Sequence, residues 1–317
     1  FILTSEDLKV ITKDIDSDEF NQLITQYRQE LSDYMNDNVF VTSEKMYDIL
    51  IRPIESEVNT IDPENLAIIA TGKLRYIPFE TLLDKEKDEF LLKKYPIHYL
   101  TRISTRAIPP NPPLQRGENV MTALALANPK PTKATLLGTE TEAQHLMDNF
   151  PGSEAYLGTD ATLKTFKENA SRFPILHLGT HGCFDPNGCP NLGMEANTIL
   201  FANNEQYNIA DAALLGLKNT EILVLSACQT AKEANANGRE LSGLAFVLER
   251  AGAKTVMASL WNADDNVSAN IMTNFYTNMK QGMSKNEAMQ RAKLNYLETG
   301  KYDHPYFWSP FILIGNN

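Results

Sequence analysis

Short apolar runs alternate with helix-like stretches through the second half of the chain. Residues 120–127, 155–157 and 173–178 have the length of buried strands, and the segments after the first two have helical spacing. Apolar runs of strand length that alternate with helices are typical of a parallel sheet with helices on its faces. The pattern therefore predicts a mainly parallel α/β fold for this half of the chain.

Two of the apolar runs end in reactive residues. Residues 173–182 end in His181 and Gly182, and residues 221–230 carry Cys228. In open α/β sheets, chemistry lies just beyond the carboxyl ends of the parallel strands. We therefore expect His181 and Cys228 to lie together at one edge of a sheet, although about 50 residues separate them in the chain.

This pair has the composition that a cysteine protease needs. The thiolate of Cys228 would be the nucleophile, and the imidazole of His181 would take the thiol proton and return it to the leaving amine. The backbone N–H groups of Gly182 and Cys228 would hold the oxyanion of the tetrahedral intermediate. The alternative is that Cys228 is a small buried hydrophobe at a strand end. His177, four residues before His181, is expected to be structural.

The first half of the chain predicts a smaller α/β region. Its first 50 residues are polar with one apolar stripe at helical spacing, formed by Phe20, Leu23, Ile24, Tyr27 and Leu31. Residues 66–70, 74–79 and 96–100 are expected to be strands. Four prolines within residues 109–113 exclude a helix or central strand there. We therefore expect residues 1–119 to form a companion region and residues 120–317 a second domain.

Several polar residues have the spacing of helix N-caps. Thr139 with Glu142, and Ser284 with Glu287, each predict a capping box at the start of a helix. Asp160 is expected to cap a further helix. These caps place helices between the predicted strands.

Charge and composition narrow the class of partner. The chain has 317 residues, 43% of them apolar, and a net charge of −11. An acidic chain of this kind disfavours nucleic acid as the main partner. No apolar run has the roughly 18 residues needed to cross a bilayer, so no membrane association is expected. The sequence has no charged-then-apolar signal segment at its start. Its first residue is Phe1 and not Met, so we expect a fragment or a processed form.

Cysteine usage indicates a reducing compartment. The three cysteines are few and odd in number, which makes a disulfide framework unlikely and fits the cytoplasm. A zinc site built from His177, His181, Cys183 and Cys189 is disfavoured, because four residues of strand span roughly 13 Å. Cys183 is expected to be a loop residue. No phosphate-binding or metal-binding motif is present, so no cofactor is expected.

At this point the sequence resembles a known family, the CHAT branch of the caspase-like (clan CD) cysteine peptidases, which are related to separases. The resemblance covers about residues 120–317, and the segment around residues 72–79 is similar to the one that usually precedes the protease. The matching motifs are Thr180-His181-Gly182, Leu225-Ser226-Ala227-Cys228-Gln229-Thr230, Ser259-Leu260-Trp261 with Asp264-Asp265, His304-Pro305-Tyr306-Phe307-Trp308, and Phe311 to Gly315.

The resemblance implies a caspase-like three-layer αβα fold, a Cys228–His181 dyad and a protein or peptide substrate. The smaller region before it would be a pseudo-caspase-like companion. In this family the strand that carries Trp261 and the loop after it line the S1 pocket, so Asp264 or Asp265 would bind a basic P1 side chain. The alternative is that both acids stabilise a helix N-terminus.

The sequence departs from the family pattern at one point that bears on specificity. Metacaspase-like enzymes carry an acid just before the cysteine, where this chain has Ser226 and Ala227. An apolar P1 side chain such as Met therefore stays open. Such families often fuse the protease to helical repeats, so an upstream TPR-like regulatory region or a regulator protein is expected. The rival hypothesis is a silent or regulator-gated signalling module.

Overall fold

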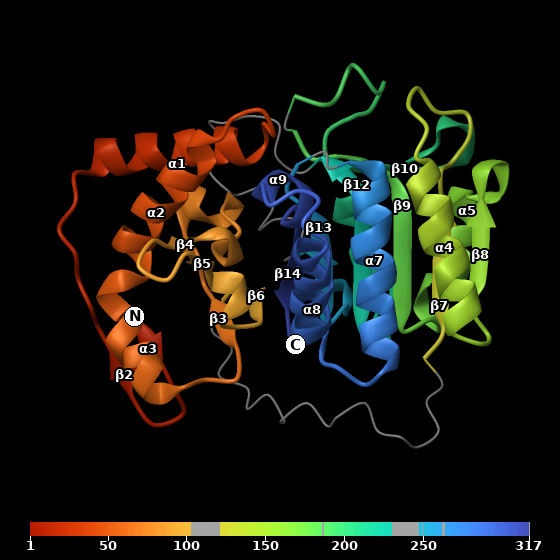
Figure 1. Cartoon of the computed structure of the whole chain (residues 1–317). Coiled ribbons are helices and arrows are strands. Elements are labelled where there is room, and N and C mark those ends of the chain that lie inside the picture. Colours follow the sequence, from red (N-terminus) through yellow and green to blue (C-terminus); the bar gives the residue numbers. More distant parts are fainter. Residues whose placement is uncertain (103–120, 186, 230–246, 249, 262–263, 317) are drawn as a thin grey trace.

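The computed structural model describes residues 1–102, 121–185, 187–229, 247–248, 250–261 and 264–316. Its centre is a sheet of parallel strands in the order β8–β7–β9–β12–β13 (Figure 1). These strands are β7 (Ala123–Ala127), β8 (Glu154–Leu157), β9 (Ile175–Cys183), β12 (Ile222–Gln229) and β13 (Thr255–Ser259). The mainly parallel sheet that the sequence predicts is confirmed.

Further strands extend this sheet in the opposite direction. β14 (Phe311–Gly315) pairs antiparallel with β13, and β6 (Ile97–Tyr99) and β3 (Leu66–Ile68) follow β14 in parallel. At the end of β9, β10 (Thr198–Leu200) pairs antiparallel and β11 (Gln206–Asn208) pairs with β10. The carboxyl ends of the parallel strands therefore lie at the opposite edge of the sheet from those of β14, β6 and β3.

Helices cover both faces of the sheet and make a three-layer structure. One face carries α4 (Leu137–Asn149), α7 (Asp265–Lys280) and α8 (Lys285–Glu298), packed over a core that includes Val224 and Phe275 (Figure 1). The other face packs α5 (Leu163–Asn169) and the 3₁₀ segment η8 (Ile209–Leu215) over a second core. Alternate strand residues supply the two cores, as Leu223 and Val224 do.

Three helices make up much of the N-terminal region. They are α1 (Ser17–Leu31), α2 (Asn38–Leu50) and α3 (Glu55–Ile61). The side chain of Asp16 caps α1 by accepting from the N–H groups of Asp18 and Glu19, and Tyr27 and Leu31 of the predicted stripe are buried. The remaining elements are the strands β1 (Ile2–Leu3), β2 (Leu8–Lys9), β4 (Leu83–Asp84) and β5 (Glu89–Phe90), the 3₁₀ segments η1 (Arg52–Ile54), η4 (Leu91–Lys93), η5 (Gly158–Asp160), η6 (Ala170–Arg172) and η7 (Ala202–Asn204), and the short helix α9 (Pro305–Trp308).

A buried ion pair joins the N-terminal region to the sheet. The Nζ atom of Lys293 on α8 lies 2.6 Å from Glu80 Oε1 and donates to the carbonyl oxygen of Phe311 at 2.7 Å. The hydroxyl of Tyr99 donates to the other carboxylate oxygen of Glu80 at 2.8 Å. Lys293 is 1% exposed and Glu80 is 4% exposed. The N-terminal region and the rest of the chain are therefore joined by a buried ion pair as well as by a common sheet. The predicted boundary at residues 109–113 lies outside the described residues and stays a prediction.

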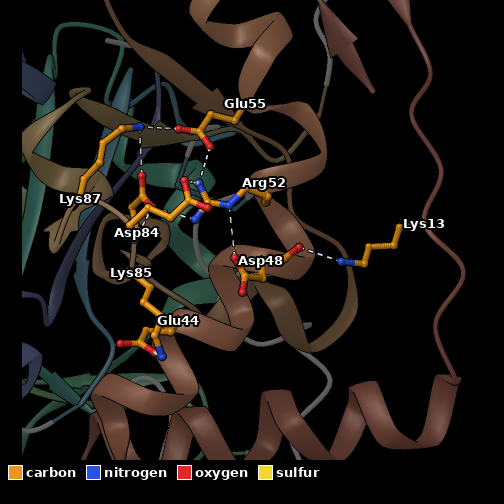
Figure 2. A network of polar contacts seen from close by, with 9 residues as sticks. Lys13, Glu44, Asp48, Arg52, Glu55, Asp84, Lys85 and Lys87 are labelled. Atoms are coloured by element: carbon orange, nitrogen blue, oxygen red, sulfur yellow. Dashed lines mark hydrogen bonds and ion pairs between the residues drawn. The ribbon is translucent and has the colours of Figure 1, made fainter.

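A partly buried ion network joins β4 and β5 to the helices beside them (Figure 2). The guanidinium of Arg52 binds Glu55 at 2.7 Å and Asp84 at 2.7 Å, and reaches Asp48 at 3.3 Å. Lys87 binds the same two carboxylates, Glu55 at 2.8 Å and Asp84 at 3.1 Å. Two cations thus bridge the same two acids, one from a helix and one from the β4–β5 hairpin.

Some predicted elements are wrong for identifiable reasons. Residues 74–79 are not a strand, because they span the end of the 3₁₀ segment η2 (Gly72–Tyr76), two linking residues and the start of the 3₁₀ segment η3 (Phe79–Thr81). Thr139 and Glu142 form no capping box, because α4 begins at Leu137 and Glu142 faces the sheet. Thr162, and not Asp160, caps α5. The capping box of Ser284 with Glu287 is confirmed.

Within the described part of the chain, no helix combines the length and apolar character that a bilayer crossing requires.

Candidate active site

His181 and Cys228 come from neighbouring parallel strands. In the register of β9 and β12, Ala227 pairs with His181 and Cys228 pairs with Gly182. Adjacent strands lie roughly 4.8 Å apart, so the backbones of the two residues are close at the carboxyl edge of the sheet. The backbone therefore brings together the two segments that the sequence analysis singled out.

A β-bulge on β9 adjusts this register. Leu225 pairs with Leu178, but Ala227 pairs with His181, so β9 carries one residue more than β12 in this interval. A bulge of this kind re-aims the side chains that follow it. Gly179 lies inside it, and a Cβ atom at this position would lie 2.4 Å from the Cβ of Thr139 on α4. Only glycine therefore allows the strand to approach α4 this closely.

His181 is held by a backbone carbonyl. Its Nε2 atom lies 2.8 Å from the carbonyl oxygen of Ala134, and the side chain is 6% exposed. A carbonyl oxygen only accepts, so the bond requires a proton on Nε2. In the neutral ring, Nδ1 is then the nitrogen that carries the lone pair, as a proton acceptor must. Ala134 could not be found from the sequence, because a backbone carbonyl has no sequence signature.

The loop that carries Ala134 is fixed by a buried asparagine. The Asn128 backbone N–H donates to the carbonyl of Gly179 at 2.8 Å, and its side-chain oxygen accepts from the N–H of Leu136 at 3.0 Å. Its amide nitrogen donates to Glu140 at 2.6 Å. Asn128 therefore ties the loop both to β9 and to the start of α4.

A buried polar group lies behind the strands. Ser226 donates to Glu142 Oε2 at 2.6 Å, and His177 Nε2 lies 2.9 Å from the same oxygen without the alignment of a hydrogen bond. The other ring nitrogen of His177 lies 2.8 Å from the hydroxyl of Tyr276. All of these side chains are buried, so His177 has the structural position that the sequence predicts.

The predicted S1 residues lie at the start of α7. The side chain of Asp264 caps α7 by accepting from Asn266 and Val267, both at 3.0 Å. Asp265 accepts from the N–H of Gly138, at the start of α4, at 2.6 Å. Burial raises the pKa of Asp265, although the Gly138 bond lowers it. Trp261 is buried, and its indole N–H donates to the carbonyl of Tyr306 at 3.0 Å. Both acids thus accept hydrogen bonds from backbone N–H groups at the start of a helix. This was the alternative to a role in binding the P1 side chain.

The cysteine next to the histidine is cross-linked. Cys183 is the last residue of β9 and forms a disulfide with Cys189. The pair packs with Met194 and Leu200 in a small apolar cluster beside β10. The expectation of a loop residue and of cysteines without a disulfide is wrong for this pair, because the loop after β9 folds back and pairs Cys189 with Met194. Cys228 is the one cysteine outside this bond.

In the described ranges, no group of three or more His, Cys, Asp or Glu side chains is placed to hold a metal ion. Distance along β9 already separates His177 from His181, and Cys183 is committed to its disulfide. The residues considered for zinc therefore do not form a ligand set.

The structure has three layers, a central sheet with helices on both faces, and its His-Gly and Cys segments lie on neighbouring parallel strands. This is a caspase-like α/β fold. The structure aligns with the crystal structure of the Arg-specific cysteine proteinase gingipain R at a TM-score of 0.51, over 94% of this chain and 74% of that chain, with 9% identity. The complex of the RgpB pro- and mature domains from Porphyromonas gingivalis gives the same TM-score at 10% identity, over 94% of this chain and 76% of that chain. At these identities the likeness shows the fold alone.

The family follows from the sequence comparison. The model of the CHAT domain matches residues 41–316, and the chain therefore belongs to the CHAT family. Tetratricopeptide repeat protein 28 of Mus musculus is 22% identical over 327 residues, and that of Homo sapiens is 22% identical over 320 residues. Each alignment covers 86% of this chain but 13% of the relative, so the chain spans a small part of these proteins.

Proposed function

We propose that this chain is a cysteine endopeptidase in which Cys228 is the nucleophile and His181 is the general base. The observation that carries the proposal is the register of β9 and β12, which pairs Cys228 with Gly182 and Ala227 with His181. The hydrogen bond from His181 Nε2 to Ala134 supports it, because it leaves the lone pair of the neutral ring on Nδ1.

The reaction has two halves. The thiol proton of Cys228 moves to His181, and the sulfur attacks the peptide carbonyl to form a tetrahedral intermediate. The N–H groups of Gly182 and Cys228 stabilise its oxyanion, the C–N bond breaks and His181 protonates the leaving amine. Water then attacks the acyl-enzyme with His181 as base, which releases the carboxylic acid and restores the thiol. No orienting acid is required, since the Ala134 carbonyl holds the ring.

The proposed S1 pocket is formed by Trp261, after β13, and by Asp264 and Asp265 at the start of α7. Trp261 is its apolar wall, and Asp265, with Asp264 beside it, selects a basic P1 side chain. Burial raises the pKa of Asp265 because it disfavours the charged carboxylate. A guanidinium at this place would stabilise the carboxylate through charge-assisted hydrogen bonds. The competing role of Asp265 is its bond to Gly138, which stabilises the start of α4.

The relatives favour a larger protein in which the peptidase activity is regulated.

 The curated relatives are named for tetratricopeptide repeats, and the chain matches 13% of their length. We propose that a TPR-like region upstream of the CHAT domain, or a separate regulator protein, controls access to the site. The protease would act on protein substrates, and the Cys183–Cys189 disulfide removes the argument from cysteine count for a cytoplasmic setting.

A second function is favoured by the names of the same relatives. A chain that accompanies tetratricopeptide repeats fits an interaction or signalling module that is catalytically silent or opens only with its regulator. This alternative predicts that peptide substrates are not cleaved by the chain alone.

Fluorogenic peptides varied at P1 test the proposal. The protein should cleave a subset of them, and Cys228→Ala should abolish the cleavage. The matched control is the double variant Cys183→Ala/Cys189→Ala, which removes the Cys183–Cys189 disulfide and should keep cleavage above half. A preference for Arg or Lys at P1 that Asp265→Asn abolishes would support the S1 assignment. Cleavage that survives in Cys228→Ala would refute the proposed nucleophile.

A further inference from the structure

Four buried polar side chains lie behind β9 and β12, the strands of the proposed dyad. They come from four different elements, Glu142 from α4, His177 from β9, Ser226 from β12 and Tyr276 from α7. Each of them is at most 7% exposed. Because α4 and α7 lie side by side over these strands (Figure 1), the cluster joins both dyad strands to the two helices above them.

Glu142 is the acceptor at the centre of this cluster. Its Oε2 atom accepts a 2.6 Å hydrogen bond from the hydroxyl of Ser226, and His177 Nε2 lies 2.9 Å from the same atom. The other oxygen, Oε1, is buried without a hydrogen-bond partner among the described residues. A buried carboxylate oxygen without a partner costs stability, so a contribution to folding does not explain Glu142.

Ser226 lies at the point where the two dyad strands change register. Leu225 pairs with Leu178 and Ala227 pairs with His181, so the bulge of β9 lies opposite Ser226. The pairing of β12 with β13 ends at Leu225. A bulge interrupts the ladder of hydrogen bonds between two strands. The side-chain bond to α4 therefore holds β12 at the place where its backbone ladder is interrupted.

The same turn of α4 also contacts the other strand of the bulge. Thr139 and Glu142 are three residues apart, so they lie on one face of the helix. Thr139 packs against Gly179 of β9, where an added Cβ atom would lie 2.4 Å from the Cβ of Thr139. Glu142 binds Ser226 of β12. One helix face thus sets the positions of both strands just before the two residues of the dyad.

We propose that Glu142 is a positioning residue, whose bond to Ser226 fixes the end of β12 and thereby the place of the Cys228 backbone beside β9. This inference rests on the proposed function, because the placement matters to catalysis only if Cys228 and His181 react together. Ser226 is two residues before Cys228, roughly 7 Å along a strand, so a displacement at Ser226 reaches the nucleophile. An error of about 1 Å in the placement of a reacting group can lower a rate about 100-fold.

Glu142→Leu tests the assignment, with Glu30→Leu as the matched control. Glu30 is also buried, and one of its carboxylate oxygens has no partner in the described structure, but it lies on α1 in the N-terminal region. We expect Glu142→Leu to lower kcat about ten-fold or more with little change in KM. Glu142→Gln keeps an acceptor for Ser226 and should recover most of this loss, whereas Glu30→Leu should leave kcat unchanged.

A double variant separates positioning from stability. Ser226→Ala leaves the Glu142 carboxylate buried without its donor and should lower the midpoint of urea unfolding. Adding Glu142→Leu removes this unpaired group, so the midpoint should return close to the native value while kcat stays at least about ten-fold low. Recovery of kcat together with the midpoint would show a merely structural role and would overturn the proposal.

Hydrogen exchange of the backbone amides provides a readout that needs no activity. In Glu142→Leu, the amides of residues 226–229 should exchange at least about ten-fold faster than in the native protein, and in Glu30→Leu they should not. If the native protein neither cleaves peptides nor reacts at Cys228, the proposed function fails, and the exchange rates still decide whether Glu142 positions β12. Unchanged exchange at these residues in Glu142→Leu would overturn the proposal.

Discussion

The Nε2 atom of His181 lies 2.8 Å from the carbonyl oxygen of Ala134, which comes 47 residues earlier in the chain. Because the carbonyl only accepts, we predict that the neutral ring of His181 is the Nε2–H tautomer. Nitrogen-15 NMR of the histidine-labelled protein, at a pH where the ring is neutral, measures this directly. His181→Gln assigns the signal, and a proton found on Nδ1 would contradict the prediction.

The role of the Ala134 loop in orienting His181 can be tested by a substitution at Asn128, which holds this loop. Asn128→Ala removes the side-chain bonds to Leu136 and Glu140 that hold the Ala134 loop. We expect peptidase activity to fall about ten-fold or more, through kcat rather than KM, because the base loses its orientation. Asn219→Ala is the matched control, since its side chain bonds the carbonyl of Ser171 at an exposed site. Similar activity in the two variants would argue against a positioning role for the loop.

Gly179 gives a prediction about the bulge. Gly179→Ala places a Cβ 2.4 Å from the Cβ of Thr139, and we expect it to destabilise the protein by about 2–3 kcal/mol. Urea unfolding measures the change. Thr139→Ala should not rescue the variant, because it keeps the clashing atom, whereas Thr139→Gly should recover part of the loss. Full stability of Gly179→Ala would show that the approach of β9 to α4 is looser than described.

The buried pair of Lys293 and Glu80 should couple the two regions energetically. Lys293→Met leaves the Glu80 carboxylate buried without its cation, and we expect a loss of about 3–5 kcal/mol in the free energy of unfolding. The double variant with Glu80→Gln should cost less than the sum of the single changes. Lys254→Met, in the exposed pair with Glu221, should cost less than about 1 kcal/mol. Equal costs for the two lysine variants would contradict this coupling.

The network around Arg52 predicts how stability depends on pH. Burial alone raises the pKa of Asp84 and of Glu55, but hydrogen bonds from Arg52 and Lys87 outweigh it and hold each pKa below its ordinary value. A depressed folded-state pKa contributes stability that is present above the unfolded-state value of about 4 and is lost as pH falls through the folded value. The free energy of unfolding should therefore fall on acidification below about pH 5.

Urea unfolding between about pH 6 and pH 3 measures this acid limb. Arg52→Gln should cost about 1.5–3 kcal/mol at neutral pH and make the fall with pH shallower. Arg172→Gln removes a more exposed partner of Glu154 and should leave the slope unchanged. An acid limb of the same steepness in Arg52→Gln and the native protein would show that other carboxylates produce it.

The sequence predicts the strands that carry the site and the helices that follow β13, because local patterns determine them. The apolar runs ending at His181 and Cys228 are strands of one sheet, and the caps at Asp264 and Ser284 lie where the spacing places them. Glu142 shows the limit of local reasoning. Its spacing from Thr139 matches a capping box, but in the fold it accepts from Ser226, 84 residues away in the chain.

Two further features of the site depend on tertiary contacts that leave no pattern in the sequence. The carbonyl of Ala134 reaches His181 only once the loop before α4 packs against β9. Cys183 and Cys189 form their bond because the loop between them turns back on β10, whereas an odd cysteine count argued for none. Both features lie within a few residues of the proposed base.

The most direct test of the Cys228–His181 dyad is labelling by a peptidyl acyloxymethyl ketone, followed by intact mass and peptide mapping. We predict one adduct, on Cys228, which is absent in Cys228→Ala and forms at least about 100-fold more slowly in His181→Ala. The Cys183→Ala/Cys189→Ala variant should be labelled like the native protein. An adduct that forms equally fast without His181, or the absence of any adduct on Cys228, would contradict the dyad.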